Sequence, residues 1–381
     1  MEWQKEKAAL KTLILGGYGN FGARIARALA PQFDSELLIG GRDARRADSL
    51  ANALGHGVQG IGIDLSEPGF SQKLSDLGIE LLIHTAGPFQ EQGYAVARAA
   101  ATAGAHYIDL SDGRRFVCDF PESLNKTFEA AGRTAISGAS TVPALSSAVV
   151  DYLCDGWHID TIDICIAPAQ SAPRGKATIA GVLSYCGAPI KVWSDGQWQT
   201  QHGWASPEFV EFSRLKPRLG ALCDIPDLEL FPQRYAARQR VMFRAALEVR
   251  FTQRAFALLS AVRVRGLLAN PEKLAGIINF GARAFDFLGT AVGAMVVRAG
   301  GVDATGKPRQ RAWHILADND YGPEIPCMAA ILLAQRMAQG ELFPPGAFAC
   351  AGMLDLSEFE PEFKRWQLVT DVVEEEISIG P

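Results

Sequence analysis

Three glycines at a fixed spacing are the residues of this chain most clearly placed to do chemistry. Gly17, Gly19 and Gly22 follow an apolar run in the pattern G-x-G-x-x-G, and a sequence typical of a helix continues after them. In such a strand–turn–helix the first glycine permits a tight turn, the second lets the backbone approach a pyrophosphate, and the third allows close helix packing. The helix N-terminus then faces the phosphates. We therefore expect a dinucleotide to contact the loop formed by Gly17, Tyr18, Gly19, Asn20, Phe21 and Gly22.

The end of the second expected strand bears on which dinucleotide is bound. NAD-preferring sites place an acidic residue about 20 residues further on, where it accepts hydrogen bonds from the ribose 2′-hydroxyl. Here the strand ends Gly40-Gly41-Arg42, so a guanidinium that can pair with a phosphate stands where the carboxylate is usual. This favours NADP over NAD. The alternative is that Arg42 begins a solvated helix face and Asp43 binds the ribose.

Two further loops follow strands of the same expected sheet. Asp64 ends the third strand, where it could accept a hydrogen bond from the adenine amino group or act as a cap before Ser66. Ala86, Gly87 and Pro88 follow the fourth strand, which flanks the topological switch point of this kind of sheet. These small residues are expected to pass close to the ribose and nicotinamide.

The candidates for proton transfer are Tyr107, Asp109 and Asp112, in the fifth expected strand and its exit loop. Hydride transfer requires little from the protein beyond orientation and a proton donor or acceptor. Asp109 could bind a substrate ammonium group or act as acid or base. It could equally be a structural carboxylate that caps nearby amides. His84 lies within the fourth strand and is expected to be a packed, hydrogen-bonded histidine.

The candidates for substrate binding lie in the second half of the chain. Arg174 and Lys176 follow a proline loop and could hold a carboxylate or phosphate, or could be surface charge. His314 precedes the polar stretch 318–321 and could line a cleft or face solvent. The histidines and carboxylates show no ligand spacing, so we expect no metal site.

A regular alternation of strand and helix patterns provides the framework for these residues. Six short apolar strands with helical crossovers predict an α/β fold, a Rossmann doubly wound parallel sheet. Alternating isoleucines at 162, 164 and 166 and a hairpin signal at Asp195-Gly196 predict a second α+β domain with a mixed or antiparallel sheet. We expect a dinucleotide-binding Rossmann domain (1–140), an α+β substrate and dimerisation domain (141–322), and a C-terminal helix and tail (323–381) that return to the Rossmann domain.

Composition limits the partners and the location. Of the 381 residues 48% are hydrophobic, and Lys+Arg 37 against Asp+Glu 42 gives a net charge of -5, which offers no indication of a nucleic-acid partner. Seven scattered cysteines without a C-x-x-C pair are typical of reduced thiols in a cytoplasmic protein. The apolar stretch 274–297 is interrupted by Arg283 and Asp286, so a core helix and a strand are expected rather than a transmembrane segment. Peripheral contact with a membrane is the alternative.

Four stretches also resemble a known family. Together, the segments 17–22, 41–43, 84–89 and 104–110 are similar to the saccharopine dehydrogenase-like oxidoreductases over roughly the first third of the chain. Segments 172–178 and 322–327 look like a bacterial branch of that group. The resemblance implies NAD(P)-dependent chemistry on the C–N bond of an amino acid or imine. No arginine pattern that would hold two substrate carboxylates is found in the second half.

The leading hypothesis is an NADP-dependent oxidoreductase, a cytoplasmic homodimer that acts on a C–N bond of a small amino-acid-like molecule. One alternative is NADPH-dependent reduction of a C=C or C=O bond in a larger apolar substrate, because the second half is apolar and lacks a carboxylate clamp. Another is a non-catalytic nucleotide-binding or membrane-associated regulatory module, because the catalytic residues are few.

Overall fold

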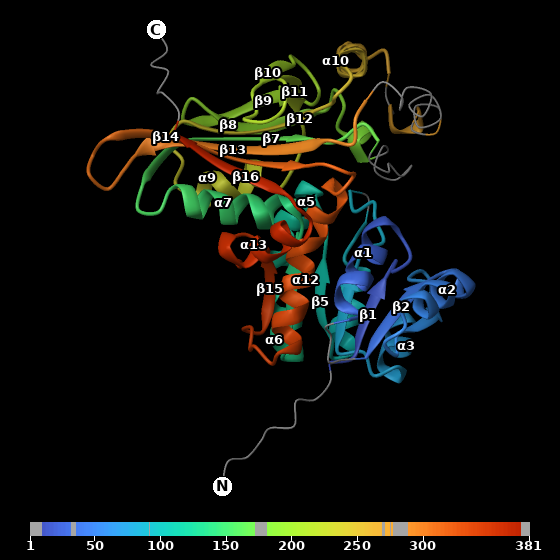
Figure 1. Cartoon of the computed structure of the whole chain (residues 1–381). Helices are drawn as coiled ribbons and strands as arrows, with labels where there is room; N and C mark the ends of the chain where they lie inside the picture. The colour runs from blue at the N-terminus through green and yellow to red at the C-terminus, as the bar shows by residue number, and fades with distance from the viewer. Residues whose placement is uncertain are drawn as a thin grey trace. The chain divides into compact units, whose positions relative to one another are not determined.

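The chain folds into two compact units. The computed structural model describes residues 10–31, 36–90, 92–171, 181–268, 271–274, 276 and 289–374 (Figure 1). The first unit contains the chain up to Thr141 together with Pro326–Cys350, and the second contains Val142–Ile325 and the residues from Ala351 onward.

The first unit is a parallel sheet with helical crossovers. Its elements are β1 (Thr12–Leu15), α1 (Asn20–Leu29), β2 (Leu37–Gly41), α2 (Ala44–Leu54), β3 (Gln59–Gly62), α3 (Phe70–Asp76), β4 (Leu81–His84), α4 (Ala95–Thr102), β5 (His106–Asp109), α5 (Arg114–Cys118), α6 (Phe120–Ala131), β6 (Thr134–Ser137), α12 (Ile325–Ala338) and β15 (Gly346–Ala349). The sheet order is β15-β6-β5-β4-β1-β2-β3, and every described pair of neighbours is parallel. The predicted Rossmann sheet is confirmed, with β15 as a seventh strand that the sequence did not reveal.

The central strands of this sheet form because they are short, largely apolar and covered on both faces. β1 and β4 are buried over their whole length, as expected for central strands of a parallel sheet. α12 is also buried around most of its surface, with Cys327, Met328 and Leu333 almost fully enclosed. The expected C-terminal helix is therefore present, as a helix of the core. From Pro326 onward it belongs to the first unit.

The second unit is built on a mixed sheet. Its elements are α7 (Ser146–Leu153), β7 (His158–Ala167), β8 (Pro189–Ser194), β9 (Gln197–His202), β10 (Glu208–Val210), β11 (Arg218–Leu222), α9 (Asp227–Arg234), β12 (Arg240–Ala246), α10 (Arg250–Val264), β13 (Gly293–Val302), β14 (Pro308–Ala317), α13 (Leu356–Arg365) and β16 (Val369–Glu374), with helical turns at Thr141–Leu145, Pro271–Leu274 and Gly322–Glu324. The main strand order is β10-β11-β12-β7-β13-β14-β16, and β8 joins β12 to β9. β7 and β12 are parallel, so the predicted α+β domain with a mixed sheet is confirmed.

Helices cover one face of this second sheet. α7 contacts β13 and β14, while α9 contacts β12 and β8 (Figure 1). The opposite face carries a small apolar cluster around Cys165, Val296 and Ala312, against which Phe212 packs. The hairpin predicted at Asp195-Gly196 is present as β8–β9, and β13 and β14 form a second antiparallel pair.

The segment after Cys350 differs from the expectation that all of 323–381 returns to the Rossmann domain. β16 pairs antiparallel with β14, with Asp371 opposite His314. The free edge of β14 accepts this strand, so the tail completes the second sheet.

Candidate functional site

The glycine loop closes tightly between β1 and α1. The Gly19 amide donates to the Gly16 carbonyl at 2.8 Å, and Gly16 itself adopts a φ of +80°. A Cβ on Gly22 would lie 2.4 Å from the Gly16 carbonyl oxygen, and a Cβ on Gly17 would lie 2.8 Å from the Ile14 carbonyl oxygen. Neither position accepts a side chain without movement of the backbone. The first-turn amides of α1 have no partner within the helix, so they are available to phosphate oxygens.

Tyr18 packs against the end of β2. A Cβ on Gly41 would lie 2.4 Å from Tyr18 Cε1, so the glycine makes room for the ring. The Tyr18 hydroxyl accepts a hydrogen bond from the Asp43 amide at 3.0 Å. The Arg46 guanidinium carbon lies 4.6 Å from the centre of the ring, a cation–π distance. Gly41, at the tip of β2, thus leaves room for an aromatic ring beside the glycine loop.

The charged side chains at the tip of β2 differ in their hydrogen bonding. Arg42, Arg45 and Arg46 are all exposed around the first turn of α2. Asp43 acts as the N-cap of α2, and its Oδ1 accepts from the Arg46 amide at 3.2 Å. One oxygen of the carboxylate that was the alternative ribose ligand therefore already accepts a stabilising hydrogen bond.

Asp64 adopts the turn role that was one of its two interpretations. Its Oδ1 accepts hydrogen bonds from the Ser66 amide at 3.0 Å and the Ser66 hydroxyl at 2.7 Å. These bonds hold the pKa of Asp64 below its usual value, and the Arg42 charge contributes in the same direction. A contact between Asp64 and adenine stays a prediction.

The loop after β4 is fastened by a residue that the sequence did not single out. The side-chain amide of Gln92 donates through Nε2 to the Ala86 carbonyl at 2.7 Å and to the Pro88 carbonyl at 2.9 Å. At the start of this loop the Thr85 hydroxyl donates to the Leu15 carbonyl at 2.9 Å, which ties it to the end of β1. The backbone of 86–88 is thus held beside the glycine loop. Gln92 lies in an irregular loop, so no periodic pattern marks it.

Asp109 joins the exit loops of β5 and β6. The carboxylate is fully buried, and its Oδ1 accepts from the amides of Ser111 and Gly138 at 2.9 Å and from the Ser137 hydroxyl at 3.0 Å. Burial raises the pKa of Asp109 to about 6, against the lowering effect of these hydrogen bonds. This geometry matches the structural interpretation of Asp109, in which the carboxylate caps nearby amides.

Tyr107 and His84 form a buried pair. The Tyr107 hydroxyl lies 2.9 Å from His84 Nδ1, and both side chains have no exposed surface. Burial lowers the pKa of His84 to about 4, so its ring is neutral at pH 7. The expectation for His84, a packed and hydrogen-bonded histidine, is confirmed. Tyr107 stacks on Phe120 inside the core, so direct action on a substrate does not fit its position.

Asp112 differs from the other two candidates because its side chain is exposed. Its Oδ1 accepts a hydrogen bond from Gln90 Nε2 at 3.1 Å. Desolvation by the surrounding protein raises its pKa even though part of the side chain reaches solvent. Among Tyr107, Asp109 and Asp112 it is the group whose proton a bound molecule can reach.

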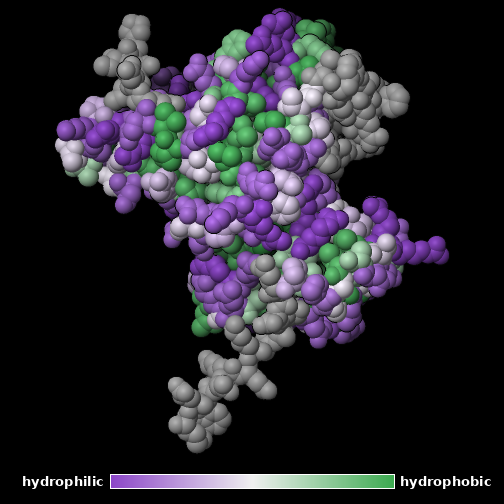
Figure 2. All heavy atoms as spheres, viewed as in Figure 1, coloured by the Kyte–Doolittle hydropathy of each residue, from purple (hydrophilic) through white to green (hydrophobic). Residues whose placement is uncertain are grey.

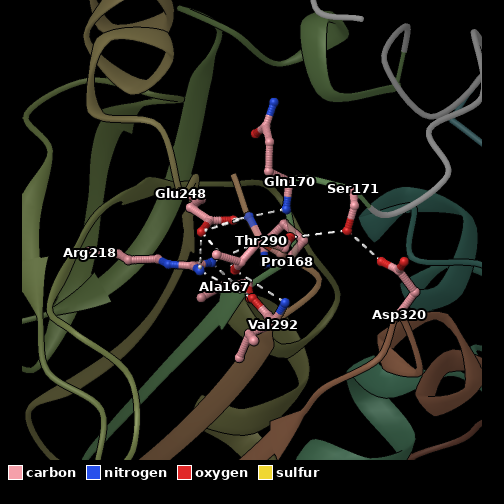
Figure 3. Close-up of polar contacts among 9 residues, drawn as sticks. All are labelled: Ala167, Pro168, Gln170, Ser171, Arg218, Glu248, Thr290, Val292 and Asp320. Carbon is pink, nitrogen blue, oxygen red and sulfur yellow. Dashed lines mark hydrogen bonds and ion pairs between the residues drawn. The ribbon is translucent and has the colours of Figure 1, made fainter. Parts of the chain in front are cut away.

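A buried ion pair organises one end of the second sheet (Figure 3). Arg218 is only 6% exposed and lies 3.4 Å from a carboxylate oxygen of Glu248. Its guanidinium donates to the carbonyls of Ala167 at 3.4 Å, Pro168 at 2.9 Å and Val292 at 3.1 Å. One side chain thereby ties the end of β7 to the residue before β13. Neither Arg218 nor Glu248 belongs to a motif, and their partners are distant in sequence.

Glu248 and Ser171 extend this arrangement toward the next segment. Glu248 accepts from the amides of Gln170 and Thr290 at 3.1 Å and from the Thr290 hydroxyl at 2.8 Å. The Ser171 hydroxyl lies 3.0 Å from the Thr290 carbonyl oxygen and 2.5 Å from Asp320 Oδ1, and its single hydrogen serves these two acceptors (Figure 3). The chain is therefore anchored up to residue 171. The candidates Arg174 and Lys176 follow directly but lie outside the described residues, so their role stays a prediction.

His314 is buried instead of lining a cleft or facing solvent. It is 6% exposed, and its Nδ1 accepts from the Ser213 amide at 3.3 Å. The next residue, Arg214, pairs through two nitrogens with Asp371 at 2.6 and 2.9 Å. The segment after β10 therefore crosses β14 and β16 and covers the histidine. Neither expectation for His314 is met, because a strand pattern alone does not show what covers that face.

The second sheet also carries a polar cavity of about 380 Å³. Its lining residues are Gln201, His202, Ala205, Ser206, Glu208, Leu222, Met242 and Arg244. Arg244 lies 2.7 Å from Glu208 and 3.5 Å from Asp163, so its charge is balanced by neighbours. Within the described ranges, no group of three or more metal-ligating side chains occurs, and no helix is long and apolar enough to cross a membrane.

Comparisons with known proteins agree with this architecture. The family model described as the saccharopine dehydrogenase NADP binding domain matches residues 12–136. No curated protein matches the chain by sequence. The solved apo structure of saccharopine dehydrogenase (L-Glu forming) from Saccharomyces cerevisiae is similar, with a TM-score of 0.69 at 14% identity over 97% of this chain and 100% of that chain. A myo-inositol dehydrogenase from Corynebacterium glutamicum has a TM-score of 0.47 at 13% identity, over 95% and 99% of the two chains.

The two kinds of similarity carry different weight. At these identities the likeness to solved structures shows the fold alone. The family model identifies residues 12–136 as a saccharopine dehydrogenase-like NAD(P)-binding domain. The predicted resemblance and the predicted class, an NAD(P)-dependent oxidoreductase, are confirmed.

Proposed function

We propose that this protein is an NADP-dependent oxidoreductase that transfers a hydride to or from the C–N bond of a small amino-acid-like substrate. The description of the matched domain as NADP-binding supports the cofactor. The name of the similar yeast structure, a saccharopine dehydrogenase (L-Glu forming), supports the C–N class. The Rossmann sheet would place the nicotinamide beside the loops that follow β1, β4 and β5.

The observation that carries the NADP preference is the tip of β2. Arg42 is exposed there beside Arg45 and Arg46, and Asp43 is engaged as the cap of α2. A 2′-phosphate would meet guanidinium groups, whereas the Asp43 carboxylate at this tip already uses one oxygen to cap α2. The Tyr18 ring, held between Gly41 and Arg46, provides an aromatic surface next to this position.

We assign the proton-transfer role to Asp112 and positioning roles to Asp109 and Tyr107. Asp112 is exposed and has a raised pKa, so it can exchange a proton with a bound molecule. Asp109 holds the loops after β5 and β6 through Ser111, Ser137 and Gly138. Replacing Asp112 by Asn should lower kcat and remove one limb of its pH profile, with unchanged NADPH affinity. An unchanged profile would exclude Asp112.

The cofactor assignment is tested by titrating the protein with NADPH and NADH and following nicotinamide fluorescence. NADPH should bind more tightly. Arg42→Ala should weaken NADPH binding about 10- to 100-fold, the range for a lost charge-assisted hydrogen bond, and leave NADH binding unchanged. Arg27→Ala, an exposed arginine of α1, is the matched control. Tighter NADH binding, or an unchanged NADPH/NADH ratio in Arg42→Ala, would show the interpretation of β2 to be wrong.

The reaction class is tested by turnover with a panel of amino acids and imines beside ketones and enones. Activity on amines or imines alone supports the proposal. Activity confined to C=C or C=O substrates would replace it with the alternative reductase, and dinucleotide binding without turnover across the panel would favour a regulatory module. We also propose a cytoplasmic homodimer, whose assembly sedimentation velocity measures directly.

A further inference from the structure

The helix α10 exposes large apolar residues and arginines on its outward side. Its inward side carries the fully buried Gln253 and Ser260, and Arg263 donates to the carbonyls of Ser184 at 2.7 Å and Cys186 at 2.9 Å. Its outward side carries large apolar residues, since Phe251 is 46% and Leu258 67% exposed. A helix of a globular unit normally turns its apolar stripe to the core. Here Phe256, whose ring centre lies 4.7 Å from that of Trp204, holds the helix in place together with the polar side chains, while other apolar residues of the helix face outward.

The outward residues form one continuous stripe. Phe251, Arg254, Ala255, Leu258, Val262 and Arg265 recur at helical spacing, which aligns them on one side of α10. Leu267 is 75% exposed just beyond the helix. On the neighbouring strand β10, Phe209 is 60% exposed with the Arg250 guanidinium 5.4 Å from its ring centre. Figure 2 shows hydrophobic and hydrophilic residues side by side where Figure 1 places α10.

We call Arg250, Phe251, Arg254, Leu258, Arg265 and Leu267 the α10 surface. The segment from Arg250 to Leu268 contains four arginines and no aspartate or glutamate, in a chain whose net charge is -5. Three of the arginines belong to the α10 surface, while Arg263 is engaged inside. A second copy of this surface would bring like charges together, which disfavours self-association through it. An anionic partner with an apolar layer beneath its charges complements it.

We propose that the α10 surface docks on an anionic phospholipid membrane. The apolar side chains would enter the boundary between headgroups and acyl chains, and the arginines would pair with lipid phosphates. Contact is peripheral, because no helix of the described residues can span the bilayer. The docking is independent of the proposed hydride transfer, since the surface belongs to the second unit and the cofactor loops to the first.

The test is co-sedimentation of the full chain with vesicles of phosphatidylglycerol and phosphatidylcholine, and with phosphatidylcholine alone. The protein should bind the anionic vesicles, more weakly as salt rises. Arg254→Gln with Arg265→Gln should reduce that binding about thirtyfold, and Phe251→Ser with Leu258→Ser at least about tenfold. Matched controls are Arg27→Gln and Leu342→Ser, at an exposed arginine and a 94% exposed leucine elsewhere. Thermal melting and NADPH binding of each variant establish that it is folded.

Each result is decisive. Loss of vesicle binding in both α10 variants, with both controls intact, supports the proposal. No binding to anionic vesicles, equal binding to neutral ones, or binding that survives both double variants overturns it. Self-association that depends on Phe251 and Leu258, without vesicle binding, assigns the surface to a second copy and also overturns it. Absence of vesicle binding does not alter the result of the NADPH titration, so the membrane proposal and the proposed function are tested separately.

Discussion

Replacing Arg218 by methionine should destabilise the second unit by about 3–5 kcal/mol, the usual cost of breaking a buried ion pair. Methionine fills a similar length but makes no hydrogen bond to the carbonyls of Ala167, Pro168 and Val292. It also leaves the Glu248 carboxylate, whose side chain is 15% exposed, without its counter-ion. The unpaired charge dominates the cost, because the amides and hydroxyl that still reach Glu248 compensate only part of it.

Urea unfolding followed by tryptophan fluorescence measures this change. Six of the seven tryptophans lie in the second unit, namely Trp157, Trp193, Trp198, Trp204, Trp313 and Trp366, so the signal reports on that unit. The matched control is Arg240→Met. Arg240 pairs with Asp163 at 2.5 Å but its side chain is 46% exposed, so its loss should cost less than about 1 kcal/mol.

A double-mutant cycle separates the charge from the packing. Arg218→Met combined with Glu248→Gln removes both charges. The double variant should therefore lose less unfolding free energy than the two single variants lose together. A coupling of about 1–3 kcal/mol is expected for residues in direct contact. If the effects of Arg218→Met and Arg240→Met are equal, or if the cycle is additive within about 0.5 kcal/mol, the reasoning is refuted.

Three further predictions concern other parts of the chain. Gly22→Ala places a Cβ 2.4 Å from the Gly16 carbonyl oxygen and should weaken NADPH binding about 10- to 100-fold by titration, whereas Gly93→Ala, in open space, should not. Gln92→Ala frees the 86–88 loop and should weaken NADPH binding about 5- to 10-fold; an unchanged Kd would exclude the role given to Gln92. Burial raises the pKa of Asp227 to about 7, so the native state keeps a proton that the unfolded chain releases between about pH 4 and 7. The stability of the wild type relative to Asp227→Asn should therefore fall as pH rises through that window, by up to about 1.4 kcal/mol per pH unit in urea titrations, and a flat difference would contradict the assignment.

The cofactor half of the molecule could be predicted from the sequence because its determinants are local. Gly17, Gly19 and Gly22 lie within six residues, between a strand and a helix that their own sequence specifies. The central strands β1 and β2 are almost entirely apolar, which identifies them without knowledge of their neighbours. β15 escaped prediction because its four residues follow a Gly/Pro-rich loop and join the sheet only by pairing with β6.

The candidate catalytic residues were chosen by position, and burial then separated them. Strand alternation alone cannot show whether a side chain at the end of β5 points into the core. Tyr107 and Asp109 are two residues apart, so they share a face, and both are enclosed. Asp112 lies beyond the strand, in a loop where its carboxylate keeps contact with solvent. Position in the exit loop was therefore the more informative signal.

The second half resisted prediction because its contacts join distant segments. Arg218 meets a carbonyl 51 residues away at Ala167 and another 74 residues away at Val292, and no local pattern encodes such a meeting. The same reason explains His314, which is covered by Ser213 from a segment 101 residues earlier. Long-range polar contacts of this kind tie strand ends in fixed positions beside Gln170 and Ser171. Substrate choice in such an enzyme would then depend on residues whose positions are determined by the fold of the whole second sheet. A cofactor-binding motif in the first unit therefore does not reveal the substrate.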